Sequence, residues 1–438
     1  MSEANLSRRI SLIQATAINM IDMVGIGPFV VISLIVQTLN GYYFLYAWIA
    51  GAVLSFVDGM VWSELGSTFP LAGGSYNFLK EGYGKKGGKL MSFLFVWQTM
   101  IQAPLVIASA AIGFAQYLTY IVPLNTVESK MVSGSVVLLI VLLLYRKIEA
   151  IGKISVALWV GVFVIMGWII IGAFAHGNFL QPIQHINDGL HLNSSFFSLL
   201  GFASVKSVYS YLGYYNVCHL GGEIKNPEKN IPRSMFISIA GICFLYLMMN
   251  VSVASVLPLD AIKKSNFVVS EYIHVIAGPT AAIVATAIIL WVAFASVFSA
   301  TLGYSRIPYA AAKDGAFFSI FAKLHPTKNF PYISLLVLGA VAFVFSLLFR
   351  LSEVIAAILA MRILIQFVGQ AVGLLLLHKR KGKDFFKWKM PLFPVPVIIA
   401  IVMWLYIFKS TNLEMMLIAA GIISAGLIAF AIKSTYKN

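Results

Sequence analysis

About twelve apolar runs, most of them near the length of a transmembrane helix, restrict the fold of this chain more than any other feature. A helix of about 20 apolar residues spans the hydrocarbon of a bilayer. The runs cover residues 11–40, 47–66, 90–120, 131–145, 152–175, 195–220, 234–257, 280–311, 332–349, 353–377, 392–408 and 415–432. Their number and length predict an all-α integral membrane protein with about 12 transmembrane helices.

The composition agrees with this class, since 60% of the residues are hydrophobic and 11% are charged, against about 25% charged in soluble domains. Cys218 and Cys243 both fall inside apolar runs, so the sequence indicates neither a disulfide framework nor a cysteine metal site. One loop holds His176, His185 and His191 without metal-ligand spacing, which favours solvated side chains over a zinc site. We therefore predict no metal and no cofactor.

The net charge of +15 is explained by the positions of the basic residues. Twenty-four lysine and arginine residues lie in the termini and one set of alternate loops, and five lie in the other set. The side richer in basic residues is cytoplasmic by the positive-inside rule. The bias predicts a multi-pass protein of the cell membrane with both termini in the cytoplasm, and it needs no nucleic-acid partner.

The first run is interrupted by the sequence IDMVGIGPFVVI at residues 21–32. Gly25 and Gly27 permit unwinding, and Pro28 suits the first turn of a restarted helix. Irregular backbone at membrane depth persists only where protein or a water-filled cavity satisfies its polar groups. The restarted helix would then direct free N–H groups into a cavity, where they suit a carboxylate. The alternative is a glycine packing motif with a proline kink.

A second interruption lies in the sixth run, within YSYLGYYNVCHLGG at residues 209–222, where Gly213 stands between aromatic residues and polar Asn216 follows. The interrupted runs are the first and the sixth, so each is the first run of a set of five. This arrangement is expected of an inverted-repeat transporter that binds its substrate at the midplane. We predict one transport domain over residues 1–438, with repeats at 11–175 and 195–378 and two peripheral helices at 392–432.

Several long motifs occur in the order typical of one family. They are GIGPF in the first run, SELGSTFPLAGGSYNFLKEGYG at residues 63–84, YSYLG and GEIKNPEKNIPRS around the second interruption, and SRIPYAAAKDGAFFSIFAKLHPTKNFP at residues 305–331. With these motifs the chain resembles the amino acid-polyamine-organocation superfamily, most of all bacterial amino acid permeases and L-type amino acid transporters. Pro28 departs from the pattern G-S/A-G-I-F of that family. The motifs cover about the first 335 residues.

The resemblance implies a leucine-transporter-like fold, with ten core helices in two inverted halves plus two peripheral helices, working by alternating access. It also implies that backbone N–H groups of the first break bind a substrate carboxylate, that carbonyl ends of both half-helices receive its ammonium, and that Tyr209 is an aromatic gate. Ordinary packing is the alternative for Tyr209. The candidate substrate-binding residues are Met23, Gly25, Ile26, Gly27, Gln102, Tyr209, Ser210, Tyr211, Gly213 and Asn216. Phe294 joins Gln102, Tyr211 and Asn216 as a candidate for specificity.

Charged residues inside the apolar runs are costly in lipid, and each is a candidate for function. They are Asp22, Asp58, Lys206 and Arg362, with Glu64 and Arg306 near cytoplasmic ends. The four could also pair between helices. Arg362, Gln366 and Gln370 repeat every four residues and form one polar face, which either lines a pathway or joins helices by hydrogen bonds.

Coupling stays open at the level of sequence. Proton-coupled members of the family carry a lysine in the fifth helix, but the equivalent position here is near Gly161, and no lysine stands there. The remaining possibilities are a proton carried by Asp22 or Asp58, a sodium ion near Ser296 and Ser299, or uncoupled exchange.

We therefore predict a secondary transporter of amino acids, as a symporter, with the proton favoured as the coupling ion, or as an exchanger. A polyamine transporter of the same fold is the alternative substrate class. A membrane receptor or complex subunit on this scaffold is the alternative from another class. No serine, histidine and acidic group converge in a way that indicates hydrolysis, so we do not predict an enzyme. The sequence does not specify which amino acid is carried or the oligomeric state.

Overall fold

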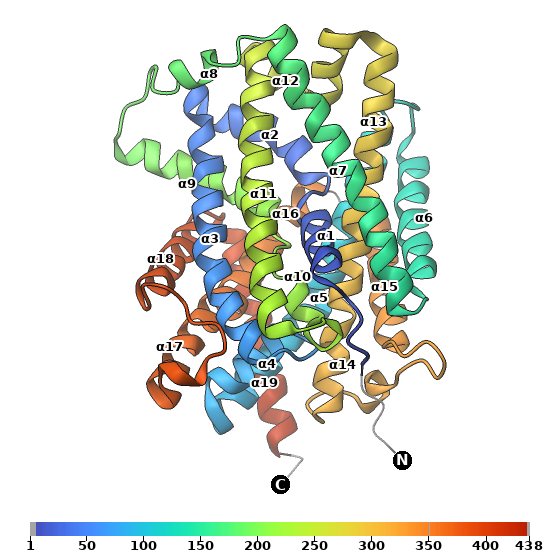
Figure 1. Cartoon of the computed structure of the whole chain (residues 1–438), viewed down its shortest axis with the longest axis vertical. Helices are drawn as coiled ribbons and strands as arrows, with labels where there is room; N and C mark the ends of the chain where they lie inside the picture. The colour runs from blue at the N-terminus through green and yellow to red at the C-terminus, as the bar shows by residue number, and fades with distance from the viewer. Residues whose placement is uncertain (1–5, 350, 436–438) are drawn as a thin grey trace.

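The computed structural model describes residues 6–349 and 351–435, which form a bundle of helices (Figure 1). Arg350 and Lys437, two of the loop and terminal residues that entered the charge analysis, lie outside the described residues. Within the described ranges the only β-structure consists of two isolated bridges, Ile10 with Ile224 and Ala72 with Leu220. The predicted all-α fold class is confirmed.

The main helices are α1 (Leu12–Met23), α2 (Gly27–Leu39), α3 (Leu45–Thr68), α5 (Gly84–Leu118), α6 (Thr126–Leu144), α7 (Ile148–His176), α9 (Ser194–Tyr211), α11 (Pro227–Val256), α13 (Val268–Tyr304), α15 (Tyr332–Leu348), α16 (Leu351–Arg362), α17 (Gly369–Lys381), α18 (Val395–Lys409) and α19 (Leu413–Thr435). Short helices are η1 (Tyr42–Phe44), α4 (Ser75–Gly82), α8 (Gln181–Gln184), α10 (Asn216–His219), η2 (Gly221–Glu223), α12 (Leu259–Lys264), α14 (Arg306–Lys313), η3 (Ser319–Ala322) and η5 (Lys383–Phe385).

Eight helices of the described chain are long and apolar enough to cross a bilayer, and the bent pair α1 and α2 makes a ninth. The apolar helices α15 and α18 are shorter, at 17 and 15 residues. Helix α9 with α10 forms the second broken run. Every predicted apolar run therefore contains a helix.

Local sequence explains the first break. Ser11 and Gln14 form a capping box that begins α1. The helix ends at Met23, and α2 restarts at Gly27 with Pro28 in its first turn, at an angle of 41° to α1. The second break follows α9, where Leu212 is extended and Gly213 has φ +122°, a conformation that favours glycine.

Two other helices depart from the boundaries expected from hydropathy. Helix α13 begins at Val268, ahead of the predicted start at residue 280, and is kinked at Gly278 and Pro279. Between α16 and α17 the backbone is π-helical over Ile363–Val368 (η4), so the tenth run is a continuous but irregular helix. π-Helical turns inside helices are frequent at functional sites.

The broken helices lie at the centre of the bundle. Helix α1 packs against α7, α11 and α13, and α2 packs against α9. The helix α19 contacts α5 and α16, and only 11% of its apolar window is buried. The division into repeats at 11–175 and 195–378, with peripheral helices at 392–432, stays a prediction.

Figure 1 shows α4, α14 and the end of α17 at the lower end of the molecule, and α8 and α12 at the upper end. The first and last described residues also lie at the lower end. The basic loops that follow α3, α13 and α17 therefore share one end with both termini. This arrangement agrees with the expected topology, whose orientation in a membrane stays a prediction.

Candidate functional site

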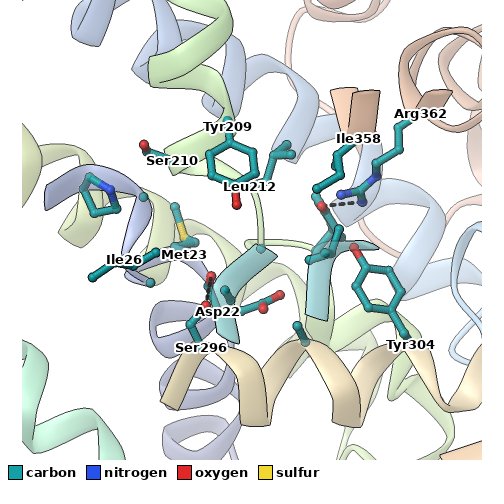
Figure 2. Close-up of a pocket in the computed structure, with 18 residues that line it drawn as sticks. Asp22, Met23, Ile26, Tyr209, Ser210, Leu212, Ser296, Tyr304, Ile358 and Arg362 are labelled. Carbon is teal, nitrogen blue, oxygen red and sulfur yellow. Dashed lines mark hydrogen bonds between the residues drawn. The ribbon is translucent and has the colours of Figure 1, made fainter. Parts of the chain in front are cut away.

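A cavity of about 50 Å³ lies where the two helix breaks meet (Figure 2). Its walls come from the first break, the second break, α5, α13 and α16. The lining residues are Asp22, Met23, Gly25, Ile26, Gly27, Pro28, Val106, Ala110, Tyr209, Ser210, Leu212, Gly213, Tyr215, Ser296, Ala300, Tyr304, Ile358 and Arg362.

The first break presents two free backbone donors at the start of α2. The N–H groups of Ile26 and Gly27 precede the first intrahelical bond and have no acceptor among the described residues. The N–H of Gly25, the third predicted donor, instead donates to the carbonyl of Met23 at 3.1 Å. The start of a helix carries partial positive charge and binds anions readily. This wall can therefore hold a carboxylate through two N–H groups.

The carbonyl groups at the ends of α1 and α9 already accept hydrogen bonds from side-chain hydroxyls. The hydroxyl of Tyr246, on α11, lies 2.7 Å from the Met23 carbonyl and 3.0 Å from the Ser210 carbonyl. The carbonyl of Asp22 accepts from Ser296 Oγ at 3.4 Å. Tyr246 therefore ties together the ends of both half-helices. A carbonyl oxygen has two lone pairs, so these groups retain a second acceptor position.

Tyr209 lies across the first break. Its hydroxyl is 3.1 Å from Ser109 Oγ, which fixes the ring between α9 and α5. A Cβ at Gly27 would be 3.2 Å from Tyr209 Cε1 and 3.4 Å from Ser210 Oγ. The ring therefore packs against the glycine at the start of α2. Its role as a gate stays a prediction.

The two breaks touch through their main chains. A Cβ at Gly213 would lie 2.7 Å from the carbonyl carbon of Asp22 and 2.7 Å from the nitrogen of Met23. Both distances are shorter than real Cβ contacts, so the absent side chain is what allows the approach. Gly213 also adopts positive φ. Glycine is required here for conformation and for space.

One acidic and one basic side chain line the cavity, Asp22 and Arg362. Arg362 Nε donates to Gln366 Oε1 at 2.9 Å, and its Nη2 donates to the Tyr215 hydroxyl. The rings of Tyr215 and Tyr304 lie 5.0 and 5.9 Å from the guanidinium carbon. Among the residues whose side chains the structure describes, no carboxylate lies within 4.0 Å of Arg362, and no donor bonds the Asp22 carboxylate. The cavity thus contains two opposite charges that form no direct ion pair with each other.

The polar face of the tenth run has different surroundings at its two ends. Arg362 lines the cavity, whereas Gln370 Oε1 accepts a hydrogen bond from Ser75 of α4 at 2.6 Å. Gln366 connects them by accepting from Arg362. One end of the face therefore belongs to the site and the other end joins helices.

Seven of the ten predicted substrate residues line the cavity, and three lie elsewhere. Tyr211 packs against Trp48 and Tyr246, on the side of α9 opposite Tyr209. Asn216 donates to Ser299 at 2.9 Å, and Gln102 lies 3.5 Å from the Tyr304 hydroxyl, behind the cavity wall. Phe294, the fourth specificity candidate, is likewise absent from the lining.

Of the coupling candidates, Asp22 and Ser296 line the cavity and two lie outside it. Asp58 is buried and accepts hydrogen bonds from the Tyr214 hydroxyl and, at 3.0 Å, from Trp404 Nε1. Ser299 Oγ donates to the Ile18 carbonyl at 2.7 Å. Both therefore hold helices together in this conformation.

Sequence reasoning missed most of the wall opposite the breaks. Each contributing helix presents residues four apart, which share a face: Val106 and Ala110 of α5, Ser296, Ala300 and Tyr304 of α13, and Ile358 and Arg362 of α16. Because Ser296 and Arg362 were already candidates, the residues four positions away from each could have been predicted from the sequence to line the cavity. Tyr215 and Leu212 lie in the irregular second break, where no periodicity applies.

Among the described residues, none of the intramembrane charges Asp22, Asp58, Lys206 and Arg362 forms a direct ion pair within 4.0 Å with another of them. Arg306 pairs instead with Glu223, at 2.9 Å and almost fully buried. Lys206 Nζ donates to Thr38 Oγ1 at 2.9 Å. No group of three metal-ligating side chains comes together in the described part of the chain.

Comparison with known proteins decides the family. The sequence profile of the family described as Amino acid permease matches residues 10–431, which is nearly the whole chain. The chain belongs to the amino acid permease family. The match extends through the last hundred residues of this permease, where the motifs were no longer distinctive.

Several bacterial relatives are similar to this permease along much of its length. The Bacillus subtilis uncharacterized amino acid permease YecA is 27% identical, over 78% of this chain and 77% of the relative. The serine/threonine exchanger SteT of the same organism is 24% identical, over 84% and 82%. Its aspartate-proton symporter is 24% identical, over 66% and 58%. These relatives include both an exchanger and a symporter.

Proposed function

We propose that this permease is a secondary transporter that moves amino acids across the cell membrane by alternating access, as a proton symporter or as an exchanger. The observation that carries the proposal is the cavity at the two breaks, which is lined by Ile26 and Gly27 with their free N–H groups and by the acidic residue Asp22. An amino acid has a carboxylate for the first and an ammonium for the second.

The same groups favour amino acids over polyamines. A polyamine has no carboxylate for the start of α2, and the guanidinium of Arg362 would repel a chain of ammonium groups. Asp22 alone would attract it.

Coupling by a proton is supported by the position of Asp22 in the cavity wall, with Ser296 Oγ bonded to its carbonyl. A relative that is named as an exchanger supports exchange as the alternative mode of transport.

Membrane-length helices and the distribution of basic loops support a multi-pass protein with cytoplasmic termini.

The test is uptake into proteoliposomes that contain the purified full-length protein. A panel of labelled amino acids identifies a substrate, and esters, decarboxylated analogues and putrescine then compete with it. We expect analogues without a carboxylate to compete at least about tenfold less well, because each charge-assisted hydrogen bond contributes about 1.5–3 kcal/mol. Equal competition by putrescine would favour the polyamine alternative. Absence of any uptake would favour a receptor or a complex subunit.

A further inference from the structure

Arg362 is the charged side chain of the cavity to which the proposed function assigns no substrate group. It is 1% exposed, and its two described hydrogen bonds, to Gln366 and Tyr215, account for two of its five N–H donors. The other three meet no acceptor in the described part of the chain. Burial of an arginine without a carboxylate in direct contact is costly, so an anion that bonds to these donors would be favoured.

The surroundings hold the guanidinium in place. Besides Tyr215 and Tyr304, the ring of Phe367 lies 5.3 Å from its carbon atom. Gln366 sits four residues further along the helix and fixes the Nε end. An arginine restrained in this way loses little freedom when it binds an anion, and its planar fork suits a carboxylate.

Figure 2 shows Ile26 and Arg362 entering from opposite sides of the view, with Asp22 between them. The cavity therefore presents a positive helix start, a negative carboxylate and a positive guanidinium. An acidic amino acid has the complementary set of α-carboxylate, α-ammonium and side-chain carboxylate.

Resting on the proposed function, we propose that Arg362 determines specificity by binding the side-chain carboxylate of an acidic amino acid of the size of aspartate or glutamate. A neutral amide of the same shape would leave the guanidinium without a charged partner. The transporter is then selective for acidic over neutral amino acids.

The test compares aspartate with asparagine, and glutamate with glutamine, as competitors of uptake in proteoliposomes. For the wild type we expect each acid to inhibit at a concentration at least about tenfold below that of its amide. Arg362→Gln removes this difference, while Arg362→Lys retains part of it. Lys206→Gln, which removes the other intramembrane cation outside the cavity, leaves the ratio unchanged.

Equal inhibition by acid and amide in the wild type overturns the specificity proposal and leaves amino acid transport standing. Transport of no amino acid overturns the proposed function itself. An unchanged ratio in a folded Arg362→Gln variant shows that another group reads the side chain. If that variant does not fold, the wild-type ratio alone decides.

Discussion

Gly27 shows how a single residue shapes the site. It stands in the first turn of α2, where its N–H is free and its Cα faces the ring of Tyr209. Any side chain here occupies the position between backbone donor and ring.

We expect Gly27→Val to abolish uptake while the protein still inserts and purifies as a single species, because its apolar helices direct insertion. The side chain would displace Tyr209, whose Cε1 lies 3.2 Å from the Cβ position. Gly167→Val on α7 is the matched control, since no atom lies within 4 Å of its Cβ position. Uptake by Gly27→Val at the rate of the control would show that the break is not the binding site.

A second prediction at this scale separates the two intramembrane carboxylates. We expect Asp22→Asn to remove the effect of a pH gradient on uptake but to retain some exchange, because Asp22 faces the cavity. We expect Asp58→Asn to keep that effect and to lower thermal stability, because Asp58 is bonded to Tyr214 and Trp404. The measurement is accumulation under an imposed gradient, with counterflow in parallel. Full pH-driven accumulation by Asp22→Asn would remove this residue from coupling.

At the scale of elements, Tyr246 connects the ends of α1 and α9 to α11. Its hydroxyl serves both the Met23 and the Ser210 carbonyl, so it sets the relative position of two helices whose intrahelical bonding stops there.

We expect Tyr246→Phe to reduce the initial rate of uptake about tenfold and to cost about 0.5–1.5 kcal/mol of stability for the lost bonding. Tyr272→Phe is the control, since its buried hydroxyl donates to the Ile169 carbonyl at 2.7 Å, away from the cavity. We expect both variants to lose similar stability, and only Tyr246→Phe to show the reduced rate of uptake. Equal rates for the two variants would limit Tyr246 to packing.

Sequence patterns predicted the positions of the helices and breaks better than they predicted which side of each helix faces the cavity. Glycine marks both breaks and proline marks the first, so their positions were readable. Tyr209 and Tyr211 belong to one motif, but residues two apart point to nearly opposite sides of a helix, and only Tyr209 lines the cavity. The start of α13 was missed because Glu271 and His274 lower the hydropathy ahead of the kink at Gly278. Hydropathy measures the preference of side chains for an apolar environment and does not detect such kinks.

At the scale of the whole molecule, a buried ion pair joins distant segments at the end that carries the basic loops. Glu223 follows the second break, and its carbonyl accepts from the N–H groups of Arg9 and Ile10. Its carboxylate binds Arg306, at the start of α14. The amino-terminal segment, the second break and the end of α13 therefore meet at one point.

We expect Arg306→Met or Glu223→Leu alone to cost about 3–5 kcal/mol, because each leaves a buried charge without its partner. The double variant is expected to cost much less than the sum of the two, which thermal unfolding in detergent measures. The surface ion pair of Lys80 and Asp314 is the control, because partly exposed ion pairs contribute only about 0–1 kcal/mol to the free energy of unfolding. Additive losses in the buried pair would show that the two charges act independently.

The contact between Gly213 and the peptide of Asp22 and Met23 has a consequence for how such a protein can be altered. This contact is made by main-chain atoms, so no substitution of a side chain can replace it. On the proposed function, the breaks bind the α-carboxylate and α-ammonium groups, which all amino acids share. The variable part of a substrate meets side chains at positions four apart on α5, α13 and α16. New substrate ranges are therefore expected to arise from substitutions on these three faces, while the machinery of movement stays unchanged.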